Sequence, residues 1–124
     1  MKLSGAEEQL MEHLWNMEKA FMKDLMEIIP EPKPAPTTIA TLLKRMTDKG
    51  FVGYTLFGNS REYYPLVKKE VYFSNHVSGM IRNNFNDSVM QFASFFTKAT
   101  NLTTSELKEL RKIIDEEIEK KKKK

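Results

Sequence analysis

Hydroxyl and cationic side chains recur at helical spacing between Pro36 and Val52, and this combination could bind the edges of DNA bases. At about 100° per residue the stretch forms two arcs. The apolar arc holds Ile39, Leu42, Leu43 and Met46. The polar arc holds Thr37, Thr38, Thr41, Lys44, Arg45 and Lys49. Thr is a mediocre helix former, but short hydroxyl side chains beside cations suit a helix that enters the major groove.

A helix with these two arcs could also be an ordinary amphipathic helix that packs on a core and does not contact DNA. The residues that follow it help to distinguish these two interpretations. Gly50 is expected to end the helix. Bulky and β-branched residues then fill Phe51–Phe57, and a turn at Gly58–Ser60 precedes a second such run at Arg61–Tyr64. This pattern predicts a β-hairpin. Three helices followed by a two-stranded hairpin form a winged helix, and with two helices expected before this one the pattern favours contact with DNA.

The elements before this helix also follow from local signals. Ser4–Glu7 has the form of a capping box, and the apolar residues behind it predict a helix over residues 4–17. A second, short helix is expected over residues 21–29, with its end at Pro30. The proline-rich segment that follows predicts a stiff, extended connector. Pro36 is well placed as the first residue of the third helix.

Three further helical stretches are expected from Lys68 onward, the last of them opened by a capping box at Thr103–Glu106. The predicted fold is therefore mainly α with a small β-hairpin. We expect an N-terminal winged-helix domain at residues 1–67, namely a helix-turn-helix plus a wing. A C-terminal helical dimerisation domain at residues 68–124 ends in a run of lysines.

Composition excludes several classes of protein. Hydrophobic residues make up 40% of the 124 residues and charged residues 30%, which is typical of a soluble globular chain. No apolar run approaches the ~20 residues that span a bilayer, and no secretory signal is evident, so we expect a cytoplasmic protein without membrane insertion. Cysteine is absent, and His13 and His76 are far apart, so no metal or cofactor is expected. No catalytic set of residues predicts an enzyme.

The charge balance leaves two classes of function open. Residues 36–67 carry an excess of cations, but residues 1–67 together hold one more acid than base. Weak basicity argues against strong non-specific binding to nucleic acid. One hypothesis is a dimeric DNA-binding repressor, and the alternative is a winged-helix protein-interaction module that does not bind DNA.

The C-terminal segment is richer in apolar residues than its length explains, because a segment this small buries a poor core alone. These residues could fold back on their own chain, but pairing with a second copy would cover more of them. The residues expected at a homodimer interface are Phe85, Val89, Phe92, Phe96, Leu110 and Ile114. A dimer would also present two helices about 34 Å apart to a palindromic site in double-stranded DNA.

The order of these motifs resembles the penicillinase repressor family of bacterial transcriptional regulators. The resemblance covers the chain from Leu3 to about Glu116. It rests on four segments: LSGAEEQLMEHLW, PTTIATLLKRMTDKGFV, YPLV and LTTSELKELRKII. It implies a homodimeric repressor with an N-terminal winged helix, and operators of dyad symmetry in front of genes for resistance to β-lactams.

The resemblance also implies which residues contact DNA. The third helix of the family lies in the major groove, and the positions that match are Thr37, Thr38, Thr41, Lys44 and Arg45. The hairpin touches the phosphate backbone, which points to Arg61 and Asn59. The family pattern usually has Trp-Ser before the proline, whereas Pro34 and Ala35 stand here. A capping hydroxyl and an aromatic anchor are therefore missing from the start of this helix.

Proteolysis in the dimerisation domain, triggered by a membrane sensor with a zinc protease, often inactivates repressors of this family. The matching bond falls at Phe95–Phe96, where better-known members have Asn-Phe. The Asn-Phe pair of this chain is Asn84–Phe85, one helix earlier. A copper-responsive branch of the family carries paired cysteines, which this chain lacks, so copper sensing is not expected.

Overall fold

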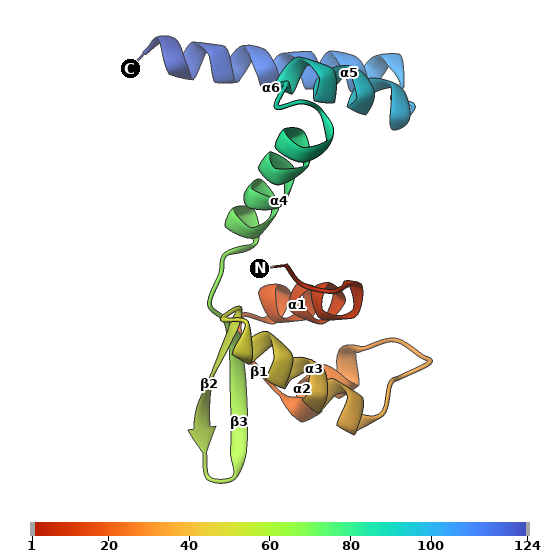
Figure 1. Ribbon diagram of the computed structural model, residues 1–124. Coiled ribbons are helices and arrows are strands. Elements are labelled where there is room, and N and C mark those ends of the chain that lie inside the picture. Colours follow the sequence, from red (N-terminus) through yellow and green to blue (C-terminus); the bar gives the residue numbers. More distant parts are fainter. Residues whose placement is uncertain (1, 124) are drawn as a thin grey trace. The chain divides into compact units, whose positions relative to one another are not determined.

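The computed structural model describes residues 2–123, and the chain forms two compact units, one ending at Ser74 and the other beginning at Asn75 (Figure 1). The elements, in chain order, are α1 (Gly5–Met17), β1 (Ala20–Phe21), α2 (Met22–Ile28), α3 (Pro36–Asp48), β2 (Val52–Phe57), β3 (Ser60–Pro65), α4 (Lys69–Asn84), α5 (Val89–Ala99) and α6 (Thr104–Lys122). The prediction of a mainly helical fold with a small β-hairpin is confirmed.

The helices begin where local signals placed them. At the start of α1, the Glu7 amide donates to Ser4 Oγ (3.2 Å) and the Ser4 amide donates to Glu7 Oε1 (2.7 Å). The same reciprocal arrangement joins Thr103 and Glu106 at the start of α6. These bonds satisfy amides that have no partner within the helix. Gly50 follows α3 with a φ of 84°, a conformation that glycine adopts without a steric penalty.

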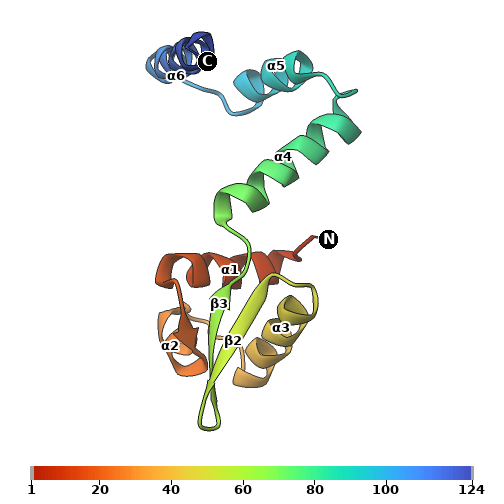
Figure 2. The same ribbon diagram turned by 90° about the vertical axis from the view of Figure 1, so that its left-hand side faces the viewer.

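The sheet contains one strand that the sequence pattern did not reveal. Its three antiparallel strands have the order β1-β3-β2, and β1 is only two residues long. Phe21, expected in the second helix, lies instead in β1 opposite Glu62, and its amide donates to Asp24 Oδ2 of α2 (2.9 Å). We call β2, β3 and their turn the wing. It projects beyond the three N-terminal helices (Figure 2).

The core of the N-terminal unit lies among α1, α2, α3 and the base of the sheet. Trp15 Nε1 donates to Val67 O (2.9 Å), and the Trp15 ring contacts Tyr72 and Phe73. The first turn of α4 therefore packs on the N-terminal unit. The buried apolar residues are Leu3, Leu10, Met11, Leu14, Ala20, Leu25, Ile39, Leu43, Met46, Phe51, Val52, Tyr63 and Tyr72.

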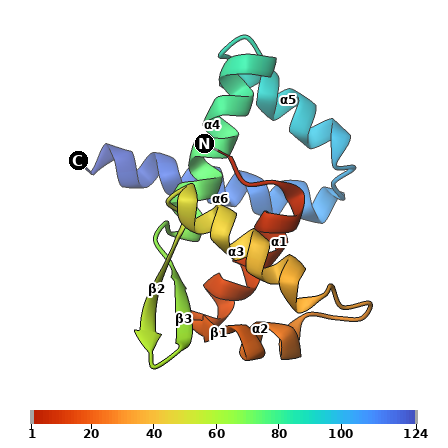
Figure 3. The same cartoon turned by 60° about the horizontal axis from the view of Figure 1, so that its bottom comes forward.

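The proline-rich connector between α2 and α3 has no regular secondary structure, but it bends at Glu31 and Pro32 instead of running extended as its composition predicted. Figure 3 shows it at the end of the helices away from the wing. Because proline removes backbone donors and fixes φ, α2 stops at Ile28 and α3 starts at Pro36. The connector thereby separates two helices that would otherwise run together.

Candidate nucleic-acid interface

The candidate interface centres on one side of α3. Ile39, Leu43 and Met46 are buried on the other side, so packing in the core fixes the rotation of the helix about its axis. The residues predicted to contact DNA from this helix are all exposed, and we call them the α3 face: Thr37, Thr38, Thr41, Lys44 and Arg45. Their exposure meets a condition that the DNA-binding interpretation requires, but contact with DNA stays a prediction.

The start of α3 has no side-chain cap. Ala35 is the N-cap residue and makes no side-chain hydrogen bond, while Pro36 occupies the first turn. This agrees with the loss of a capping hydroxyl that the sequence indicated. The N-terminus of a helix carries partial positive charge and amide donors that can bind a phosphate oxygen. The start of α3 offers an anion fewer donors than most helices, because Pro36 has no N–H and the Thr38 amide already donates to Ala35 O (2.9 Å).

Two polar groups of the α3 face already have partners within the helix. Thr41 Oγ1 donates to Thr37 O (2.9 Å), which leaves its methyl group and hydroxyl lone pairs for an outside partner. Lys44 Nζ forms an ion pair with Asp48 Oδ2 (3.1 Å), and both side chains are exposed. An exposed i,i+4 pair is worth only about 0.3–0.5 kcal/mol, so Lys44 can exchange Asp48 for a phosphate at little cost.

The wing carries the other two predicted residues, Asn59 and Arg61, and both are exposed. The turn uses Gly58, whose φ is 63°, at the first central position of a two-residue loop. Arg61 Cζ lies 4.4 Å from the centroid of the Tyr54 ring. This cation–π contact holds the guanidinium against β2 and leaves N–H donors for a phosphate.

An open groove of ≈ 1020 Å³ between α2 and the wing contains a cation that the sequence analysis missed. Lys23 of α2 and Arg61 of the wing both line it, together with Pro36 at the start of α3. The rings of Phe21 and Phe57 also line it, with their centroids 5.8 Å apart. The methionines of α2 led to the interpretation of this helix as part of the core, so its solvent side was not considered. Lys23 is exposed on that side.

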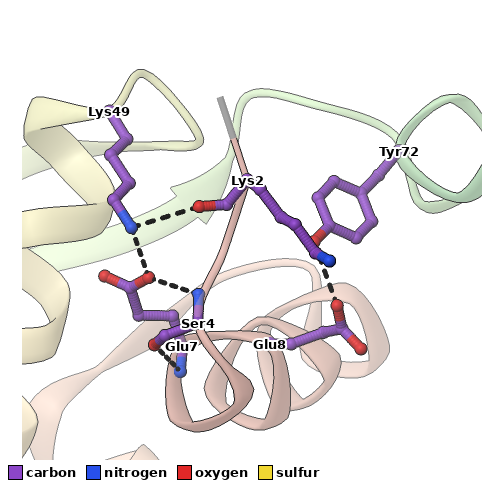
Figure 4. Close-up of polar contacts among 6 residues, drawn as sticks. All are labelled: Lys2, Ser4, Glu7, Glu8, Lys49 and Tyr72. Carbon is purple, nitrogen blue, oxygen red and sulfur yellow. Dashed lines mark hydrogen bonds and ion pairs between the residues drawn. The ribbon is translucent and has the colours of Figure 1, made fainter. Parts of the chain in front are cut away.

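Lys49 lies on the polar arc of the helix but does not belong to the α3 face, because it is half-buried rather than exposed. Its ammonium points to the first turn of α1 (Figure 4), where Nζ donates to Glu7 Oε1 (2.6 Å). Burial alone raises the pKa of Glu7, but hydrogen bonds with Lys49 and Ser4 and the charge of Lys49 outweigh it, so the pKa lies below its ordinary value. Sequence reasoning recognised Glu7 only as half of a capping box.

The residues predicted at a dimer interface lie in the C-terminal unit, in which none of residues 75–123 is fully buried. Four phenylalanine rings gather there: the centroid of Phe85 is 5.5 Å from that of Phe92 and 5.2 Å from that of Phe95, and Phe92 stacks on Phe96 at 6.2 Å. The remaining predicted residues are Val89 on α5 and Leu110 and Ile114 on α6, of which Val89 and Ile114 are exposed.

The predicted cleavage region lies inside a helix. Phe95 and Phe96 both belong to α5, and both side chains are exposed. Asn84 is the last residue of α4, and Phe85 follows it in the turn. Proteases bind extended backbone, so α5 would have to open locally before the Phe95–Phe96 bond could be cut.

Residues 2–123 also bear on metal binding and membrane insertion. They contain no group of three or more His, Asp or Glu side chains placed to hold a metal ion. None of the helices formed by these residues combines the length and apolar character needed to cross a bilayer. Neither finding changes the choice between the two classes of function.

Comparison with known proteins decides the family. A family model described as penicillinase repressor matches residues 3–116. The chain belongs to the penicillinase repressor family. The family consists of transcriptional repressors rather than enzymes, so the coarse function of the chain is repression of transcription.

Named members of the penicillinase repressor family align with almost the whole chain. The methicillin resistance regulatory protein MecI of Staphylococcus aureus (strain N315) is 29% identical over 119 residues, covering 92% of this chain and 94% of MecI. MecI of Mammaliicoccus sciuri is 28% identical over the same length, with the same coverage.

A solved structure supports the fold of the N-terminal unit. The solution structure of the DNA-binding domain of the repressor BlaI superposes with a TM-score of 0.52 and 24% sequence identity. It covers 57% of this chain and 88% of the BlaI domain. This similarity confirms the winged helix, whereas the residues that contact DNA are not identified by it.

Proposed function

We propose that this repressor is a homodimer that occupies a dyad-symmetric operator in double-stranded DNA. The observation that carries the proposal is the α3 face, a set of short hydroxyls and cations exposed on a helix whose other side is held in the core. Packing therefore presents these groups on a rigid support. A rigid helix with short side chains can enter the major groove and place them against base edges.

The proposed roles follow from the chemistry of each side chain. Arg45 can bind guanine through two parallel hydrogen bonds, and the Thr41 methyl can contact the methyl of thymine. Lys44 exchanges Asp48 for a phosphate or a base. Arg61 and Asn59 of the wing contact the phosphate backbone, which positions the protein without reading sequence.

The dimer follows from the apolar surface of the C-terminal unit. Single apolar side chains scattered over a protein surface are normal, whereas a contiguous group of exposed apolar side chains marks an interface. Residues 75–123 include no fully buried side chain, and exposed Val89 lies on α5, the helix that carries three of the four clustered phenylalanines. A second copy that covers this surface would stabilise the unit and hold two α3 faces over the halves of one palindrome.

The experiment is selection of bound fragments from random DNA, followed by affinity measurements on the selected operator. Thr41→Ala and Lys44→Ala should each weaken operator binding by about 1–3 kcal/mol. Arg61→Ala should weaken binding to all sequences alike and reduce the salt dependence.

Thr47→Ala is the matched control, because Thr47 lies on the same helix and makes the same kind of hydroxyl bond, to Leu43 O (2.7 Å). Thr47 is half-buried and lies outside the α3 face, so its loss should leave operator affinity unchanged. If no DNA is selected, the alternative of a protein-interaction module gains support. Exposed Leu56 and Phe57 on the wing would then be the first surface to examine.

We further propose that the regulated genes confer β-lactam resistance and that proteolysis relieves repression. The MecI relatives, described as methicillin resistance regulatory proteins, support the first part. The second part is supported by the resemblance to family members that are cleaved at the bond matching Phe95–Phe96 of this chain. The repressor would lie in the cytoplasm, and a membrane sensor-protease would be the partner that triggers its cleavage. Immunoblots of induced cells test the second part, since a repressor that stays full length while its genes are expressed would refute it.

A further inference from the structure

The first turn of α1 holds the end of α3 through one buried ion pair. Glu7 is only 1% exposed and Lys49 is 28% exposed. Glu7 Oε1 accepts from Lys49 Nζ (2.6 Å) and from the Ser4 amide (2.7 Å). Lys49 Nζ also donates to Lys2 O (3.2 Å). Figure 4 shows the Lys49 ammonium between Glu7 and the Lys2 carbonyl, with the Ser4 amide on the same carboxylate of Glu7.

Lys49 is the C-cap residue of α3, so the ion pair acts directly on the helix that carries the α3 face. The start of α3 has no comparable anchor, because Ala35 caps it without a side-chain bond and an irregular connector precedes it. The C-terminal end of α3 is therefore the end at which a polar contact fixes its place. Glu7 and Lys49 are 42 residues apart in sequence.

The ion pair is a costly way to stabilise a fold. Glu7 Oε2 is buried without a hydrogen-bond partner among residues 2–123, and buried polar atoms without partners are destabilising. Buried ion pairs are often no more stabilising than apolar residues of the same volume. The charge-assisted hydrogen bond of 2.6 Å nevertheless holds the end of α3 at a short, set distance from the first turn of α1.

We propose that Glu7 and Lys49 are positioning residues for DNA recognition, which fix the axial position of α3 so that the α3 face meets the bases in register. The inference rests on the proposed function, because it requires sequence-specific binding by α3. Glu7 is buried on α1 and cannot contact the bases itself. Its effect on DNA binding would pass through Lys49 to the position of α3.

The next residue of α1 supplies a control. Glu8 Oε2 accepts from the Tyr72 hydroxyl (3.0 Å), which joins the same turn of α1 to α4 rather than to α3. Tyr72→Phe keeps the ring contacts of Tyr72 with Trp15 and Phe51 and removes the bond to Glu8. It perturbs the same end of α1 without touching α3.

The experiment measures affinity for the selected operator and for a scrambled duplex, with the melting temperature of each variant. Glu7→Gln should lose roughly tenfold in operator affinity, the weight of about one base contact, and change scrambled-duplex affinity less than about twofold. Lys49→Gln should behave in the same way, whereas Lys49→Arg should retain most of the affinity. Tyr72→Phe should lower the melting temperature and leave operator affinity unchanged.

Each other outcome overturns the inference. An equal loss on both duplexes, or an unchanged operator affinity in Glu7→Gln, would show that the pair does not position α3. Unfolding of both Glu7→Gln and Lys49→Gln would assign the pair to the fold instead. Failure of the proposed function gives a different result, because the wild-type chain itself would then not distinguish the two duplexes, and the inference would fall with it.

Discussion

Replacing Ile114 with Ser should weaken self-association of the chain and leave the N-terminal unit folded. Ile114 is 51% exposed on α6, so about half of its side chain is left for a partner to cover. Full burial of such a side chain contributes about 1.5–3 kcal/mol. Half of that value, counted in both protomers, gives about 1.5–3 kcal/mol for the dimer. The dissociation constant of the dimer should therefore rise roughly 10- to 150-fold.

Sedimentation equilibrium over a range of protein concentrations measures this dissociation constant, and circular dichroism checks the fold of each variant. Ile28 provides a matched control, because it is 48% exposed on α2 of the N-terminal unit, outside the proposed interface. Ile28→Ser makes the same chemical change at nearly the same exposure. It should leave the dissociation constant of the dimer unchanged.

Two results would refute this reasoning. A wild-type chain that sediments as a monomer at micromolar concentration would remove the dimer itself. Equal shifts of the dissociation constant in Ile114→Ser and Ile28→Ser would show that loss of apolar surface acts on stability in general. In either case the exposed apolar residues of the C-terminal unit would need another explanation than a second copy of the chain.

Three further predictions concern single contacts. Asp48→Asn releases Lys44 from its ion pair and should raise operator affinity about twofold at low salt; an affinity that falls in the binding assay would contradict the exchange. Trp15→Phe removes the donor to Val67 O and should cost about 1–3 kcal/mol in the free energy of unfolding by urea. The lowered pKa of Glu7 stabilises the fold fully above its ordinary value of 4.5 and progressively less as pH falls through the folded-state pKa. The stability difference between wild type and Glu7→Gln should therefore shrink as urea titrations are repeated at pH values below 4.5, and a constant difference would exclude this role of the Glu7 charge.

The bounds of α3 and the side it exposes could be predicted because both depend on near neighbours in sequence. Pro36 begins the helix, and Gly50 follows it in a left-handed conformation. The spacing of apolar residues then determines which side enters a core. The exposure of Thr41 and Lys44 followed from that spacing, although their contact with DNA remains a proposal.

The parts that could not be predicted depend on residues far apart in sequence. Strand β1 is two residues long, too short for any periodic pattern, and exists because β3 offers it an edge. Lys49 lies on the polar arc of an isolated helix, yet in the folded chain it binds Glu7. The position of a residue on an arc gives the direction of its side chain about the helix axis. It does not identify the residue of another element that the side chain contacts.

Sequence by itself determined where α1, α3 and α6 start and that the chain has a wing, because capping, proline, glycine and periodicity act within a few residues of one another. Tertiary structure alone decided that Trp15 binds Val67, that Glu7 binds Lys49, and that no side chain of residues 75–123 is fully buried. These outcomes depend on which surfaces meet after the chain folds, and packing is a property of the whole unit rather than of a local segment.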